Sequence, residues 1–276
     1  MTISAFLPVF NEEKRIRDTL ISLMWCDEII LIDKKSNDRT VEIALTFGNK
    51  VKVFSINNSS SYDPIEWEIF LENSSSEWVI IFTASDVIHP KLVDNILSLI
   101  SKEESCFDII HIPFKRFVLG LDSNKSPWHS KLSPKVVRKS SIVLNLGGGV
   151  HDVIKFIGNK IQLPINNEQC MYHLTHETVD LMMERHIRYW RRDAKNDKIE
   201  LKQSLKSVIY GFFNLLFIRR TWTLGYDGLM LMFSYSSNLM MSYVYKWEKS
   251  RSNASTVYLT IRNEINAEWK KIKFEN

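Results

Sequence analysis

Apolar runs alternate with amphipathic segments along residues 1–100. Runs dominated by apolar residues lie at 5–10, 28–32, 51–56 and 77–83, as in parallel strands that are buried on both faces. Apolar residues recur at helical spacing in the segments between them, at 39–47, at 64–73, after Asn11 and from Pro90 onward. This alternation predicts an α/β domain, with a mostly parallel sheet and helices on its faces.

The pattern changes after residue 100. Further strands are predicted at residues 107–113 and around Val136, and a long helix is predicted at 178–195. The arginines of that helix, Arg188, Arg191 and Arg192, indicate a solvated cationic face. We therefore expect three regions: 1–100 and 101–175, which form two halves of one α/β unit, and a helical region at 176–276.

Two stretches without charge stand out in the helical region. They span 12 residues at 207–218 and 18 residues at 228–245. A spanning helix needs about 20 predominantly apolar residues, so even the longer stretch is marginal. Aromatic and cationic residues near its ends, such as Trp222 and Lys246, suit an interface. Two alternatives follow: helices that lie on a membrane or form a dimer surface, or a helical subdomain that covers the sheet.

Composition excludes some classes of function. The chain has 276 residues, 45% hydrophobic and 25% charged, and a net charge of +4. This charge is too mild to indicate a nucleic-acid partner. The three cysteines, Cys26, Cys106 and Cys170, are widely spaced and suit a reducing compartment. Because the chain enters a strand without a signal-peptide pattern, we expect a cytoplasmic protein, either free or on the inner face of the membrane.

The first two strands each end in a polar turn. Asn11 follows the first strand, with Glu12 and Glu13 after it, and Asp33 ends the second strand. The carboxyl ends of neighbouring parallel strands form the crevice where open α/β sheets bind ligands. Many α/β domains begin in this way, so nucleotide binding and a purely structural role both remain open at this stage.

The residues of these turns resemble the opening of family 2 glycosyltransferases, which have the GT-A fold. The matching positions are Pro8, Asn11, Glu12, Asp33, Ser36, Asp38 and Thr40. Lys34 and Lys35 depart from the family, which usually has Asp-Gly there. The resemblance implies that the base and ribose of a nucleotide sugar contact Pro8, Glu12, Asp33 and Ser36.

The fourth strand ends in Thr83-Ala84-Ser85-Asp86, where the family has D-x-D. There the paired carboxylates hold Mg²⁺ or Mn²⁺ on the donor diphosphate. Thr83 and Ser85 replace both acids, and Asp86 follows them. The resemblance implies donor contacts from Ala84, Ser85 and Asp86, and a metal held by Asp86 and a late histidine, His173. Two alternatives are a metal-free enzyme, with Lys34 or Lys35 on the diphosphate, and a domain that binds without chemistry.

Residues 146–154, LGGGVHDVI, form a second informative segment. Consecutive glycines permit positive φ and close approach of a ligand. In the lipopolysaccharide-core type of β-glucosyltransferase, which this segment resembles, the position reads G-x-x-H-E. Asp152 matches the Glu and would be the general base; its alternative role is a helix cap. Further donor contacts are expected from Gly148, Gly149, His151 and Arg138, although Arg138 also fits a surface cation.

The resemblance as a whole implies an inverting glycosyltransferase. The donor would be a nucleotide-diphosphate sugar, with UDP the favoured nucleotide, and the acceptor a cell-surface glycan or a lipid-linked glycan. The tail pattern of the same subgroup favours the lipid-linked acceptor; here it is matched by Phe217, Arg219, Gly225, Asp227 and Gly228. The alternative is a silent nucleotide-sugar-binding or scaffold protein on the same fold, because the D-x-D positions are degenerate.

Overall fold

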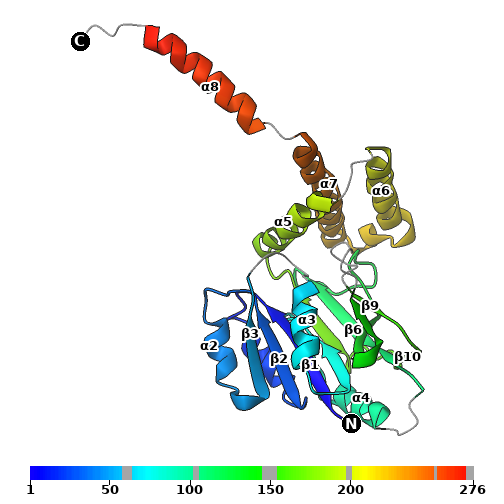
Figure 1. The fold of residues 1–276 in the computed structure, drawn as a ribbon. Helices are drawn as coiled ribbons and strands as arrows, with labels where there is room; N and C mark the ends of the chain where they lie inside the picture. The colour runs from blue at the N-terminus through cyan, green and yellow to red at the C-terminus, as the bar shows by residue number, and fades with distance from the viewer. Residues whose placement is uncertain (58–63, 102–105, 145–153, 197–200, 252–253, 272–276) are drawn as a thin grey trace.

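The computed structural model describes residues 1–57, 64–101, 106–144, 154–196, 201–251 and 254–271 (Figure 1). Its first half is a parallel sheet whose strands match the four apolar runs. They are β1 (Ile3–Val9), β2 (Glu28–Asp33), β3 (Val51–Ser55) and β4 (Trp78–Ile81). In space β1 lies between β2 and β4, and β3 pairs with β2 at the edge.

The remaining strands of the same sheet run in both directions. Its strands are β5 (Asp86–Ile88), β6 (Ile109–Val118), β7 (Leu132–Arg138), β10 (Lys160–Gln162) and β11 (Met171–Thr175). The strand order is β3-β2-β1-β4-β7-β6-β11-β5, with β10 paired to β6. Because β7 is antiparallel to β4, its first residues lie at the same edge as the end of β4. This edge carries the candidate site.

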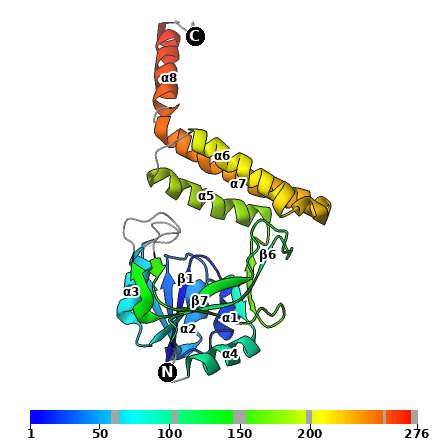
Figure 2. The same cartoon turned by 90° about the vertical axis from the view of Figure 1, so that its right-hand side faces the viewer.

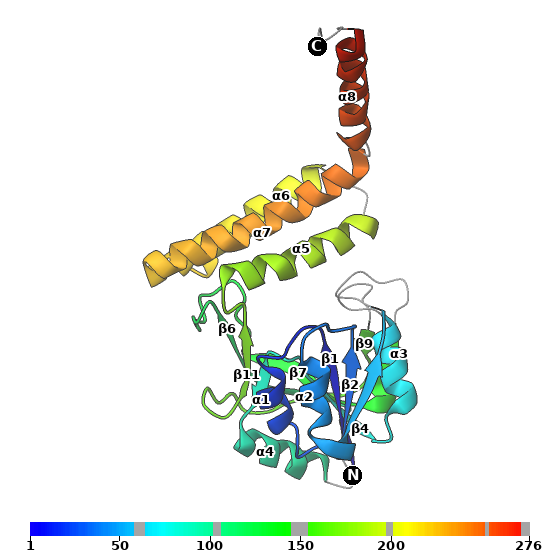
Figure 3. The same cartoon turned by 90° about the vertical axis from the view of Figure 1, so that its left-hand side faces the viewer.

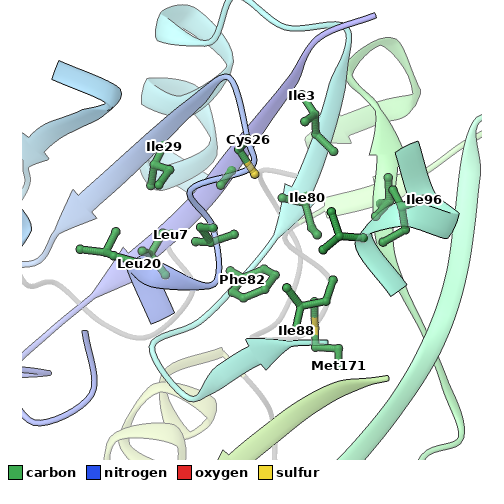
Figure 4. Close-up of a cluster of buried hydrophobic side chains, with 14 of the residues drawn as sticks. Ile3, Leu7, Leu20, Cys26, Ile29, Ile80, Phe82, Ile88, Ile96 and Met171 are labelled. Atoms are coloured by element: carbon green, nitrogen blue, oxygen red, sulfur yellow. The ribbon is translucent and has the colours of Figure 1, made fainter. Parts of the chain in front are cut away.

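Helices cover both faces of the sheet, as the alternation predicts. On one face, α1 (Ile16–Ile21), α2 (Thr40–Leu45) and α4 (Pro90–Ile100) pack on Ile3, Leu7 and Ile29 (Figure 4). On the other face, α3 (Pro64–Asn73) and the hairpin of β8 (Ile142–Leu144) and β9 (Ile154–Phe156) pack on Phe6 and Ile30. Neighbouring residues of β1 thus enter different cores, as the period of two of a strand requires.

The helical region stacks beyond one end of the sheet. Its helices are α5 (Val179–Asn196), α6 (Leu201–Phe213), α7 (Tyr226–Arg251) and α8 (Ala254–Lys271). Figures 2 and 3 show α5 between the sheet and the α6–α7 pair, with α8 extending away from the body. Among the described residues, no helix combines the length and apolar character needed to cross a bilayer.

An aromatic cluster joins α5 to α7 and to the loop after β11. His176 and His186 lie at its centre, 8% and 4% exposed, with ring centroids 5.1 Å apart. Trp128 contacts both His176 and Tyr235 of α7, and Trp190 packs against His186. Burial, followed by the charge of neighbouring groups, lowers the pKa of His176 to about 3, and burial lowers the pKa of His186 to about 4.

These two histidines should make the stability of the protein depend on pH. Above pH 6.5 both histidines are mostly neutral in the folded chain and in the unfolded chain. Below pH 6.5 they become protonated in the unfolded chain, but in the folded chain they stay neutral until the pH approaches their lowered pKa values of about 4 and 3. The free energy of unfolding therefore falls as the pH is lowered through this range. From pH 7 to pH 5 we expect a loss of about 2–4 kcal/mol, measured by urea unfolding. His186→Phe should remove roughly half of this dependence. A free energy of unfolding that is constant over this range would contradict the assignment.

Candidate active site

The two polar turns are bound to each other through their side chains. Asn11 has a φ of 55°, and it does not cap the following helix, because α1 begins only at Ile16. The turn at Asn11 instead bonds the turn at Ser36: Asn11 N–H donates to Ser36 Oγ at 2.9 Å, and Asn37 N–H donates to Asn11 Oδ1 at 2.9 Å. Glu12 N–H donates to Thr40 Oγ1 at 2.7 Å. These motif residues therefore fix the two strand ends relative to each other.

Asp33 is part of the same arrangement. Its side chain is buried, and Oδ1 accepts from Ser36 N–H at 3.0 Å. Asp33 and Ser36 thus brace the turn and do not line the cleft, whereas Lys34, which follows Asp33, does. Contact of these two side chains with a nucleotide stays a prediction.

A cleft of about 390 Å³ opens at the ends of β1 and β4. Pro8 and Glu12 line it from the first turn, Thr83, Ala84 and Ser85 from the fourth strand end. The remaining walls come from α3, the start of β7, β9, β11 and α5; they include Glu66, Trp67, Pro134, Lys135, Phe156, His173, Thr175, Arg185, Arg188 and Tyr189. Segments far apart in the sequence therefore meet here.

One wall of the cleft is aromatic. The ring of Phe6 stacks on Trp67 with 3.9 Å between centroids. Beside it, Lys34 forms an ion pair with the buried Glu66 of α3. The helix α3 thus contributes to the cleft an aromatic side chain that is largely buried, with Trp67 4% exposed.

A second wall is cationic and comes from α5. Arg185 is 14% exposed; it donates to Thr175 Oγ1 at 2.7 Å and lies 3.7 Å from Glu12 Oε1. Arg188 lies over the ring of Phe10 at 5.6 Å. The interpretation of this helix as a solvated cationic surface is therefore wrong for Arg188, which lines the cleft. The sequence analysis missed Arg185, although its spacing of three from Arg188 places both on one helical face.

Ser85 connects that wall to the fourth strand end. Its hydroxyl oxygen accepts from Arg15 at 3.1 Å and faces Arg185 at 3.5 Å. The hydroxyl of Thr19 in α1 lies within hydrogen-bond distance of the carbonyls of Ala84 and Asp86, at 3.1 and 3.2 Å. The position of a missing acid is thus occupied by a neutral acceptor between two guanidinium groups.

Asp86 and His173, the expected metal ligands, do come together. His173 Nδ1 lies 2.6 Å from Asp86 Oδ1. Asp86 Oδ2 accepts from the backbone and hydroxyl of Thr83 at 2.9 and 3.1 Å, and from Lys135 Nζ at 3.1 Å. Burial alone would raise the pKa of Asp86, but Lys135, His173 and the Thr83 bonds hold it below its usual range. Burial lowers the pKa of His173 despite its carboxylate partner, so we assign a neutral ring that donates from Nδ1.

These donors do not fit a divalent cation. Asp86 is 0% exposed, and both of its oxygens are engaged by protein groups. Over the described ranges, no three His, Cys, Asp or Glu side chains converge on one point. The expectation that Asp86 and His173 hold Mg²⁺ or Mn²⁺ therefore disagrees with this arrangement.

Residues 4–150 match the family model described as glycosyl transferase family 2. The chain belongs to this family. It is 23% identical over 261 residues to an uncharacterized glycosyltransferase of Rickettsia bellii, which covers 87% of this chain and 85% of the relative. It is also 26% identical over 123 residues to the poly(ribitol-phosphate) β-N-acetylglucosaminyltransferase TarS of Staphylococcus aureus, covering 42% of this chain and 21% of TarS.

Solved structures of glycosyltransferases are similar at low identity. A crystal structure of S. aureus TarS 1–349 with UDP-GlcNAc has a TM-score of 0.45 and 16% identity, with 92% of this chain and 93% of that chain covered. Glucosyl-3-phosphoglycerate synthase from Mycobacterium tuberculosis, in complex with Mn²⁺, UDP-glucose and glycerol 3-phosphate, has a TM-score of 0.38 and 19% identity, with 53% and 63% covered.

Arg138, for which a donor contact is predicted, lies away from the cleft of this glycosyltransferase. Arg138 pairs in sheet register with Trp78, at the end of β4 remote from the cleft. It forms ion pairs with Glu77 and Asp108 and lies over the Trp78 ring at 4.6 Å. Its predicted contact with a donor phosphate is therefore wrong, because its guanidinium is held at the opposite edge of the sheet. Gly148, Gly149, His151 and Asp152 lie outside the described residues.

Proposed function

We propose that this glycosyltransferase transfers a sugar, with inversion, from a nucleoside-diphosphate donor to a glycan acceptor. The observation that carries the proposal is the charge of the cleft at the strand ends. Lys34, Lys135, Arg185 and Arg188 face it against the carboxylates of Glu12 and Glu66. A net positive, partly desolvated cleft attracts a diphosphate and stabilises the charge that grows on it as it leaves.

The donor would lie along the cleft with its base at the aromatic wall. Pro8 and the largely buried Trp67 line this end of the cleft, and Asp33 stands at the adjacent strand end. A carboxylate there accepts the imide N–H of uracil, which favours a UDP-sugar. The diphosphate would then face Lys135 and Arg185, near Ala84 and Ser85.

In the proposed reaction, the hydroxyl oxygen of the acceptor attacks the anomeric carbon of the donor sugar. The new carbon–oxygen bond forms as the bond to the diphosphate oxygen breaks, and its electron pair leaves with the nucleoside diphosphate. Asp152 takes the proton of the hydroxyl. Gly148, Gly149 and His151 are proposed as further contacts of the donor.

For the acceptor we propose a cell-surface glycan carried on a lipid, by analogy with the lipopolysaccharide-core subgroup. Exposed apolar residues at the corner between α6 and α7 support a site on the inner face of the cytoplasmic membrane. They are Phe213, Phe217, Ile218, Trp222 and Tyr226, and Arg219 and Arg220 lie among them. The exposed helix α8 offers a surface for a homodimer.

A panel of donors tests the proposal. UDP-, GDP-, CMP- and dTDP-sugars are added to the full chain, with and without Mn²⁺, and the melting temperature is recorded. A matching donor at a hundred times its Kd contributes about 2.7 kcal/mol, which raises the melting temperature by roughly 5–10 °C. A protein that responds to none of the four overturns the proposal. Release of nucleoside diphosphate separates a transferase from a silent binding protein.

A further inference from the structure

We infer that Lys135 takes the place of a divalent cation in this enzyme, so that donor binding and transfer proceed without metal. The inference rests on the proposed function, since it concerns the diphosphate end of the same cleft. Lys135 comes from β7, whose first residues line the cleft opposite Thr83 and Ser85. Its ammonium lies 3.1 Å from Asp86 Oδ2, so a cationic group already occupies one side of this carboxylate.

The surroundings of Lys135 support a fixed cation. The fully buried carboxylate of Asp86 holds the ammonium of Lys135 in an ion pair. The ring of Phe114 lies under Nζ at 5.4 Å, and the side chain is 12% exposed. A lysine held in this way is a preorganised point charge in the wall of the cleft.

The neutral residues Thr83 and Ser85, which replace the two acids of the D-x-D motif, also support binding without metal. A carboxylate at position 83 or 85 would add negative charge beside Asp86 and demand a metal to offset it. Thr83 instead donates its hydroxyl to Asp86 at 3.1 Å, and Ser85 accepts from Arg15 at 3.1 Å. With two neutral residues and Lys135, the turn needs no further cation to stay folded.

Calorimetric titration of UDP into the full chain tests the inference, in EDTA and in Mn²⁺. We expect the same Kd within about twofold in both buffers, and a Kd about 10–100-fold weaker for Lys135→Met. Binding that requires Mn²⁺ overturns the inference but leaves the proposed function intact. No binding of any nucleotide in either buffer overturns the proposed function itself.

Two further variants separate binding from folding. Lys135→Met leaves the buried charge of Asp86 without its cation, so the double variant Asp86→Asn with Lys135→Met removes both charges together. We expect this double variant to keep its fold, checked by near-UV circular dichroism, and to remain about 10–100-fold weaker for UDP. Lys115→Met, which removes a lysine that pairs with Asp122 away from the cleft, should bind UDP as the parent does. UDP binding by the double variant at the parent's strength would overturn the role of Lys135.

Discussion

Arg185→Ala should lower kcat/KM for sugar transfer by about 10²–10³-fold, the usual cost of removing one donor that stabilises transition-state charge. Burial, reinforced by the nearby Arg15, lowers the pKa of Arg185, so its guanidinium is a desolvated charge. Glu12 offsets part of this charge from 3.7 Å. The departing diphosphate would offset the rest, and most strongly as its bond to the sugar breaks. The loss should therefore fall on kcat more than on KM.

Two variants serve as controls for Arg185. Arg185→Lys keeps the charge but loses the planar fork, so it should recover only part of the activity. Arg191→Ala removes an exposed arginine from the same helix and should have kcat/KM within about twofold of the parent, because surface charges contribute little. If Arg185→Ala and Arg191→Ala have equal activity and melting temperature, the diphosphate does not bind where we place it.

The local pattern predicted most of the sheet because burial alone dictates it. The apolar runs that became β1, β2 and β4 are enclosed by helices on both faces, which requires apolar residues at nearly every position, whereas β3 at the edge is only partly buried. The pattern did not predict that β7 lies between β4 and β6. Pairing between strands depends on contacts across the whole chain, and nothing in a single run records its partner.

The turn residues were recognised by type, but their tasks differ from those expected. A short polar side chain after a strand is able to cap a helix, bond a neighbouring turn or meet a ligand. Asn11 and Ser36 bond each other's turns, and this choice depends on the register of β1 and β2. The sequence identifies the polar side chains that are available at the strand ends. The register of β1 and β2 determines which groups these side chains bond.

The cations of the cleft were missed for a different reason. The family pattern directs attention to acids at the fourth strand end, whereas Lys135 and Arg185 belong to β7 and α5. The available signal was the pair Thr83 and Ser85: a site that has lost both acids needs another source of positive charge for a diphosphate. Lys34 was named for that task, and it does line the cleft, where it forms an ion pair with Glu66. Lys135, on the strand β7 that runs antiparallel to β4, is the better candidate.

Asp152→Asn should lower the rate of transfer by about 10²–10⁴-fold, the range for loss of a general base, and leave the Kd of the donor unchanged. An amide of the same size is unable to take the proton of the acceptor hydroxyl. The rate is measured as release of nucleoside diphosphate, and the Kd by calorimetric titration in the same buffer. Asp122→Asn, a matched change in a side chain that pairs with Lys115, should leave both quantities at the parent's values.

The same substitution decides between the two roles of Asp152. If this residue only caps a helix, asparagine replaces it at almost no cost, because Asn and Asp cap helices about equally well. Turnover would then stay within about twofold of the parent, in contradiction to a general base. Asp152→Ala would not separate the roles, since alanine removes the cap and the base together. Loss of turnover in the asparagine variant, with an unchanged melting temperature and donor Kd, therefore identifies a carboxylate that acts on the acceptor.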